Sequence, residues 1–131
     1  MAFSESVKTV SLVAGATFSS SDLYKFVTVS GGQAILPNTT GNVLPIGVLY
    51  GRTSTTSAGT QAVPVAISGI AKVQLAASTQ AAGDFVGSST AGLGIVPTTD
   101  AYTAGQIVSG SSGSAGRIAS VNLFTGPLST P

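Results

Sequence analysis

The sequence predicts an all-β fold, a compact β-sandwich or barrel-like sheet of about eight to ten short strands with little or no helix. Two observations support this prediction. Short runs rich in Val, Ile and Thr recur along the 131 residues, and Gly, Pro, Asn and Ser separate them. In addition, no window carries apolar residues at the i, i+3, i+4, i+7 spacing of a helix without a Gly, Pro or β-branched interruption.

The first part of the chain is expected to hold four strands and one tight hairpin. Gly31-Gly32 predicts a two-residue turn between the second and third strands, and 18–22 reads as a turn, or as one helical turn. Early in the second strand, Tyr24 and Phe26 point away from Val27, so both faces are apolar. We expect one face to be buried and the other to form an interface. The four expected strands are 7–13, 23–30, 33–36 and 46–50.

The central segment 61–75 is expected to form a long bent strand, or two strands joined at Gly69. In its first half, Val63, Val65 and Ile67 are expected to point inward, and Ala62, Pro64 and Ala66 outward. Pro64 has no N–H to donate, which predicts a free sheet edge or a bulge there.

The last part of the chain is expected to add short strands around a Gly/Ser-rich connector at 110–116. In the final strand, Ala119, Val121 and Leu123 share one face, and Ile118 and Phe124 share the other. The strands expected here are 85–86, 94–97, 106–108 and 117–124. We therefore predict a 1–6 N-terminal arm, a 7–124 single β domain and a 125–131 C-terminal tail.

The residue inventory gives little support for catalysis or metal binding. The chain has no His and no Cys, so the usual general base, the thiol nucleophile and the preferred zinc and copper ligands are missing. Its four acids include Asp22, Asp84 and Asp100, which lie in turn-like contexts where Asp is favoured for local hydrogen bonding. We expect no enzyme activity, no cofactor and no metal.

Charge is scarce: only 7% of residues are charged, against about 25% in an average domain. The five Lys and Arg are scattered and the net charge is +1, so we expect no direct nucleic-acid binding and no polybasic membrane contact. No apolar run is long enough for a membrane helix, and the N-terminus has no signal-peptide pattern, which predicts synthesis in the cytoplasm. An uncharged surface repels its neighbours weakly and suits a packed assembly.

Candidate interface residues are mostly aromatic, since aromatic side chains are favoured at the centres of interfaces. Phe3 and Phe18 lie outside the expected strands and could plug the core or anchor the chain in a neighbouring subunit. The full set of interface candidates is Phe3, Val7, Phe18, Tyr24, Phe26 and Pro64.

Taken in order, several segments resemble the small capsid cement, or decoration, proteins of tailed bacteriophages. The loop 38–44 and the tail after Phe124 depart from the family pattern. The matching segments are 7–14 (VKTVSLVA), 45–49 (PIGVL), 63–73 (VPVAISGIAKV), 81–86 (AAGDFV), 94–97 (GIVP) and the closing stretch 105–123.

This resemblance implies a structural virion protein on the outer surface of the capsid. It would bind the major capsid protein, bridge its subunits on the expanded, DNA-filled head, associate as a homotrimer, and catalyse no reaction. A second interpretation is another self-assembling subunit, such as a tail, fibre or pilus-like component. A carbohydrate-binding module is a third, although the chain has no Trp and only three Tyr.

Overall fold

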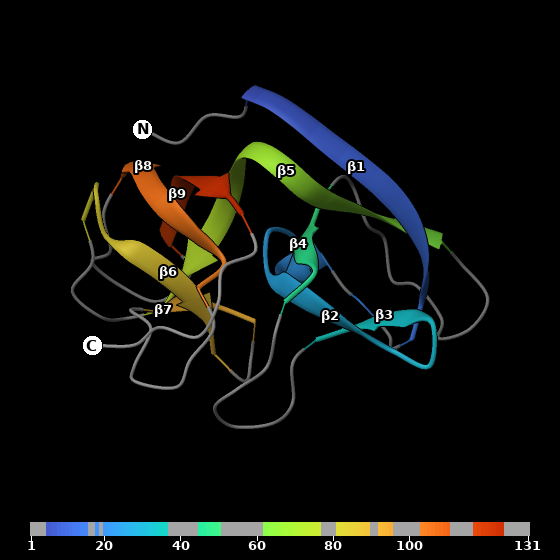
Figure 1. Ribbon diagram of the computed structural model, residues 1–131. Helices are drawn as coiled ribbons and strands as arrows, with labels where there is room; N and C mark the ends of the chain where they lie inside the picture. The colour runs from blue at the N-terminus through green and yellow to red at the C-terminus, as the bar shows by residue number, and fades with distance from the viewer. Residues whose placement is uncertain are drawn as a thin grey trace.

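The fold is all-β, as the sequence predicts (Figure 1). Within the residues that the structure describes, the only helical element is one 3-10 turn, η1 (Ser20–Asp22), where the sequence indicates a turn. The structure is a computed structural model, and the residues it describes are 5–15, 18, 20–36, 45–50, 62–76, 81–89, 92–95, 103–110 and 117–124.

Nine strands make up the sheet in the described part of the chain, and most of them are short, as expected from runs of Val, Ile and Thr bounded by turn residues. The first strand begins at Glu5, two residues before the expected start. The strands are β1 (Glu5–Ala14), β2 (Phe26–Ser30), β3 (Gln33–Ile35), β4 (Gly47–Leu49), β5 (Ala62–Leu75), β6 (Phe85–Ser88), β7 (Gly94–Ile95), β8 (Gly105–Ser109) and β9 (Arg117–Leu123).

The sheet closes on itself twice, which gives the molecule two barrel-like halves. Its strand order is β1-β3-β2-β4-β5-β7-β6-β8-β9, and two additional pairings join β1 to β5 and β5 to β9. The first half is therefore the ring β1-β3-β2-β4-β5, and the second half is the ring β5-β7-β6-β8-β9. Because β5 belongs to both rings, it is the strand that joins the halves (Figure 1).

β5 is a single long strand whose partners change near Gly69. Its first part pairs antiparallel with β1 and β4, and Gly69 to Leu75 pairs antiparallel with β9. Gly69 has a φ of 95°, a conformation that side chains with a Cβ rarely adopt. The prediction of one long strand with an irregularity at this glycine is therefore confirmed.

The β2–β3 hairpin also follows the sequence. Ser30 pairs with Gln33, which leaves Gly31 and Gly32 as the two turn residues. Their φ values are 60° and 78°, and positive φ at both central residues is what a type I′ turn requires. Glycine meets that requirement without steric cost.

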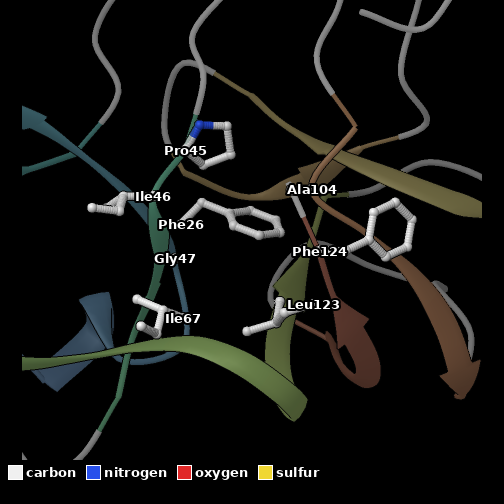
Figure 2. A pocket seen from close by; sticks show the side chains of 8 residues that line it. All are labelled: Phe26, Pro45, Ile46, Gly47, Ile67, Ala104, Leu123 and Phe124. Carbon is white, nitrogen blue, oxygen red and sulfur yellow. The ribbon is translucent and has the colours of Figure 1, made fainter. Parts of the chain in front are cut away.

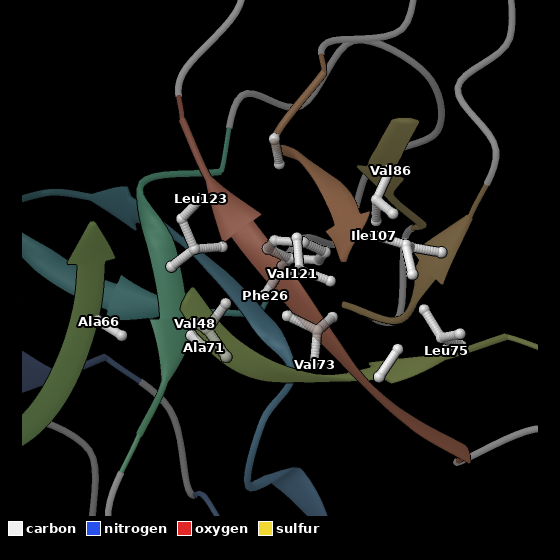
Figure 3. Packing of buried hydrophobic residues seen from close by; sticks show 12 residues of the cluster. Phe26, Val48, Ala66, Ala71, Val73, Leu75, Val86, Ile107, Val121 and Leu123 are labelled. Carbon is white, nitrogen blue, oxygen red and sulfur yellow. The ribbon is translucent and has the colours of Figure 1, made fainter. Parts of the chain in front are cut away.

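Each half encloses its own apolar core. The first core consists of Ala14, Phe18, Val27, Ala34, Leu49, Val63 and Val65. The second core is larger and takes most of its members from β5, β8 and β9 (Figure 3). It consists of Phe26, Val48, Ala66, Ala71, Val73, Leu75, Val86, Ala104, Ile107, Ala119, Val121 and Leu123.

A row of side chains from the first half fills the second core. Phe26 pairs with Val48, and Val48 pairs with Ala66, so the three residues lie side by side across β2, β4 and β5. All three are fully buried in the second core. Ala66 was expected to point outward. That prediction is wrong because this side of β5 faces the second core.

Candidate functional site

A hollow among the described residues lies where the two halves meet, and it is too small for a ligand. It measures about 10 Å³, roughly the room for one water molecule. Small-molecule pockets are typically about 300–1,000 Å³. The residues that line the hollow are mainly apolar: Phe26, Pro45, Ile46, Gly47, Ile67, Ala104, Leu123 and Phe124 (Figure 2).

The described acidic side chains serve local structure. Asp22 Oδ1 lies 3.2 Å from Lys25 Nζ, forming an ion pair three residues apart in sequence. The Asp84 carboxylate accepts a 2.9 Å hydrogen bond from the backbone N–H of Ala81 and so closes the turn before β6. Both aspartates therefore lie in turns, as predicted. Across the described ranges, no three His, Cys, Asp or Glu side chains gather as metal ligands, and no helix is long and apolar enough to cross a membrane.

Tyr24 and Tyr50 form an aromatic pair beside the second core. Their ring centroids are 5.3 Å apart with the planes tilted by 58°, and Lys72 Nζ lies 5.9 Å from the centroid of Tyr24. Burial raises the pKa of Tyr50, while a hydrogen bond from the backbone N–H of Lys72 (3.4 Å) opposes the rise. Both rings thus contact groups of the chain itself, whereas a sugar-binding platform needs an open aromatic face.

Two of the predicted interface aromatics belong to the cores. Phe18 is fully buried in the first core and Phe26 in the second, so neither presents surface to a partner. The structure corrects their assignment as interface residues and places Phe18 as a core plug, the other expectation for that residue. The face of β2 that we expected to form an interface instead packs, through Phe26, into the second core of the same chain.

The remaining candidates are distributed over the fold and do not form one surface patch. Val7 and Tyr24 are partly buried and pack against the second core. Pro64 is half-buried in β5, pairs with Ser11 of β1, and accepts a 2.9 Å hydrogen bond from Tyr50 N–H. In a strand, the nitrogen and the carbonyl of one residue point to the same side. The ring nitrogen of Pro64, which has no hydrogen to donate, therefore lies on the side of β5 near the end of β4 at Leu49. Phe3 lies outside the described residues.

The structure reveals an exposed apolar pair that the interface list missed, Phe85 and Phe124. The Phe85 and Phe124 rings meet edge to face with centroids 6.3 Å apart. Phe124 and Ile46 both line the hollow between the halves (Figure 2). A signal was present in the sequence, because strand alternation placed Phe124 on the face opposite Leu123.

Comparison with protein-family models gives no match, and comparison with curated proteins gives none either. Among solved structures, the chain is similar to the N base of the head fibre protein gp8.5 of bacteriophage phi29. The TM-score is 0.57 at 16% sequence identity, with 94% of this chain and 98% of that chain covered. At this identity the likeness shows that the two chains share a fold.

Proposed function

We propose that this chain is a non-enzymatic structural subunit of a bacteriophage particle, seated on the outer surface of the head as a fibre component or its base. The observation that carries the proposal is the shared fold, which extends over nearly the whole of both chains. By its name, that neighbour is the base of a head fibre of a bacteriophage. This proposal follows the second interpretation of the sequence more closely than the first.

The chemistry of the chain supports a role in contact over a role in reaction. The hollow between the halves has room for only about one water molecule, and the described aspartates are engaged in turns. Only 7% of all residues are charged, so copies packed together repel one another weakly. Such a surface is suited to close packing against other protein subunits.

Cementing of the shell is the finer role that the family resemblance implies. A protein that binds only the assembled shell stabilises it by mass action, and linked copies bind with avidity. We propose the major capsid protein as the partner and a homotrimer as the bound form. Native mass measurement tests the trimer: closed trimers support it, whereas open-ended polymers favour a self-polymerising subunit.

The experiment that tests the proposed function is labelling of purified particles of the phage that encodes the chain. We expect antibody against the chain to label the outside of intact heads, with many copies per particle by quantitative mass spectrometry. Absence of the chain from purified particles would overturn the proposal. Heating particles stripped of the chain separates the roles: reduced heat tolerance supports cementing, and unchanged tolerance supports a fibre base.

A further inference from the structure

We infer that the chain is a tandem duplication, in which the two halves repeat one five-stranded unit and share β5. This inference goes beyond the proposed function, because it concerns how the fold is built and which residues of the two halves are equivalent. In the first half, β1 pairs parallel with β3, and antiparallel pairings run from β3 through β2 and β4 to β5 and back to β1. In the second half, β5 to β9 repeat this plan in the same chain order, and the parallel pair is β5–β7.

The two halves also agree in their pairing register. Val27 lies opposite Gly47 in the first half, and Val86 lies opposite Gly105 in the second. A Cβ added at either glycine would meet the same two groups of the next strand, a carbonyl oxygen and Cγ1 of the valine one residue before it. A shared strand order does not require a shared register, so the agreement points to one repeated unit.

The turns that lead into β2 and β6 are equivalent as well. Tyr24 N–H donates to the carbonyl of Leu49 at 2.8 Å, and Gly83 N–H donates to the carbonyl of Ile107 at the same distance. Tyr24 has a φ of 70°, which is uncommon for a residue with a Cβ, and Gly83 has a φ of 97°. The unusual backbone of Tyr24 is therefore a feature of the repeated turn, which the second half forms with glycine.

The sequence retains part of the repeat. Identical residues occupy several equivalent positions, and each of the two isoleucines among them is followed two residues later by a proline, Pro37 or Pro97. The identical pairs are Phe26 and Phe85, Val27 and Val86, Ile35 and Ile95, Gly47 and Gly105, and Val65 and Val121.

The halves differ where their surroundings differ. The buried row of Phe26, Val48 and Ala66 is covered by the second half. The equivalent row of the second half runs across β6, β8 and β9 and consists of Phe85, Gln106 and Asn122. Phe85 is 53% exposed, and its two neighbours in the row are polar, as expected for a copy that no further unit covers.

One pair of equivalent positions shows a compensated exchange. Where the first strand of each half meets its parallel partner, Ala14 pairs with Ala34 in the first half, and Leu75 pairs with Gly94 in the second. In both halves the next residue of the first strand donates its N–H to the carbonyl of that partner, at 2.7 and 2.8 Å. A Cβ at Gly94 would lie 2.9 Å from Leu75 Cδ2, so the larger leucine requires the smaller glycine.

The test is a pair of double-mutant cycles in the full chain, measured by thermal melting with circular dichroism. The first cycle gives the second half the alanine pair of the first half, through Leu75→Ala and Gly94→Ala. We expect Gly94→Ala alone to lower the melting temperature by about 4 °C or more, because its Cβ meets Leu75. In the Leu75→Ala background, the same change should leave the melting temperature unaltered or raise it.

The second cycle gives the first half the leucine–glycine pair of the second half. Ala14 is fully buried, so Ala14→Leu alone should crowd the first core and lower the melting temperature by a similar amount. Adding Ala34→Gly should recover about half of that loss or more. This cycle separates duplication from a local steric contact, because the first half accepts the exchanged pair only where its surroundings match those of the second.

Ala14→Leu combined with Ala71→Gly is the matched control. Ala71 is also a fully buried alanine, but it belongs to the second core, so the two effects should add. Recovery in both cycles, with additive effects in the control, supports the duplication. Additive effects in either cycle, or a double variant that does not fold, would overturn it.

Discussion

Phe26 and Val27 are consecutive residues of β2, yet their side chains enter different cores. Phe26 is fully buried in the second core and Val27 in the first. The two halves therefore share a wall of β2, β4 and β5, with both faces covered by apolar side chains. Because this wall is buried on both sides, we expect the two halves to unfold together.

Replacing Phe26 by Ala should destabilise the whole molecule. Truncating a buried Phe costs about 3–5 kcal/mol, and the ring fills the second core from a strand of the first half. We expect urea denaturation, followed by circular dichroism, to show one transition with an unchanged slope and a lower midpoint. Phe85→Ala is the control, because its half-exposed ring should cost no more than about 1.5 kcal/mol. Two separate transitions would contradict the shared wall.

Gly69 should resist substitution because β5 changes partners there. Its φ of 95° strains any residue with a Cβ, so Gly69→Ala should lower the free energy of unfolding by about 1–2 kcal/mol. Gly32→Asn is the comparison: its φ is 78° in an open hairpin turn, where Asn is tolerated, and its effect should stay within about 0.5 kcal/mol. Equal stability of Gly69→Ala and wild type would show that β5 relaxes without cost.

Gly47 should be the least tolerant glycine of the shared wall. A Cβ at this position would overlap the carbonyl oxygen of Ala66 and lie 2.9 Å from Val65 Cγ1. Because β4 and β5 are paired here, the backbone cannot move aside, and Gly47→Ala should cost about 3 kcal/mol or more. The neighbouring change Ile46→Ala, at an exposed side chain, should cost under about 1 kcal/mol. Thermal melting of both variants checks the ranking, and a Gly47→Ala variant as stable as Ile46→Ala would refute it.

Tyr50 should make stability fall at alkaline pH. Burial raises the pKa of Tyr50 above its ordinary value of about 10, so the unfolded chain releases this proton at lower pH than the folded chain. The contribution is therefore complete below about pH 10 and is lost as the pH rises from there toward the folded pKa. Denaturation midpoints measured from neutral to alkaline pH should fall less in Tyr50→Phe than in wild type. Parallel curves would show that Tyr50 has the same pKa in both states.

Strand positions could be predicted from the sequence because they depend on local patterns. The Gly31-Gly32 pair by itself predicts the β2–β3 hairpin, which the structure confirms. The alternation of Ala119, Val121 and Leu123 predicts one buried face of β9, and all three residues are buried. The irregularity at Gly69 likewise shows as a break in alternation. Each of these features is determined by residues within one strand or turn.

The double closure could not be predicted, since it depends on pairings between distant segments. β5 pairs with β1 and with β9, which lie at opposite ends of the chain. An alternating pattern assigns one inward face to a strand, but Val65 and Ala66 are both fully buried because a separate core lies on each side. For the same reason the apolar second face at Phe26 was interpreted as an interface, and the exposed pair of Phe85 and Phe124, which joins two distant segments, was missed.

The most direct measurement is a cryo-electron microscopy map of the head of the phage that encodes this chain. The proposed function predicts density for the two closed halves on the outside of the shell. A map of intact particles in which that density is missing from the head surface would contradict the account.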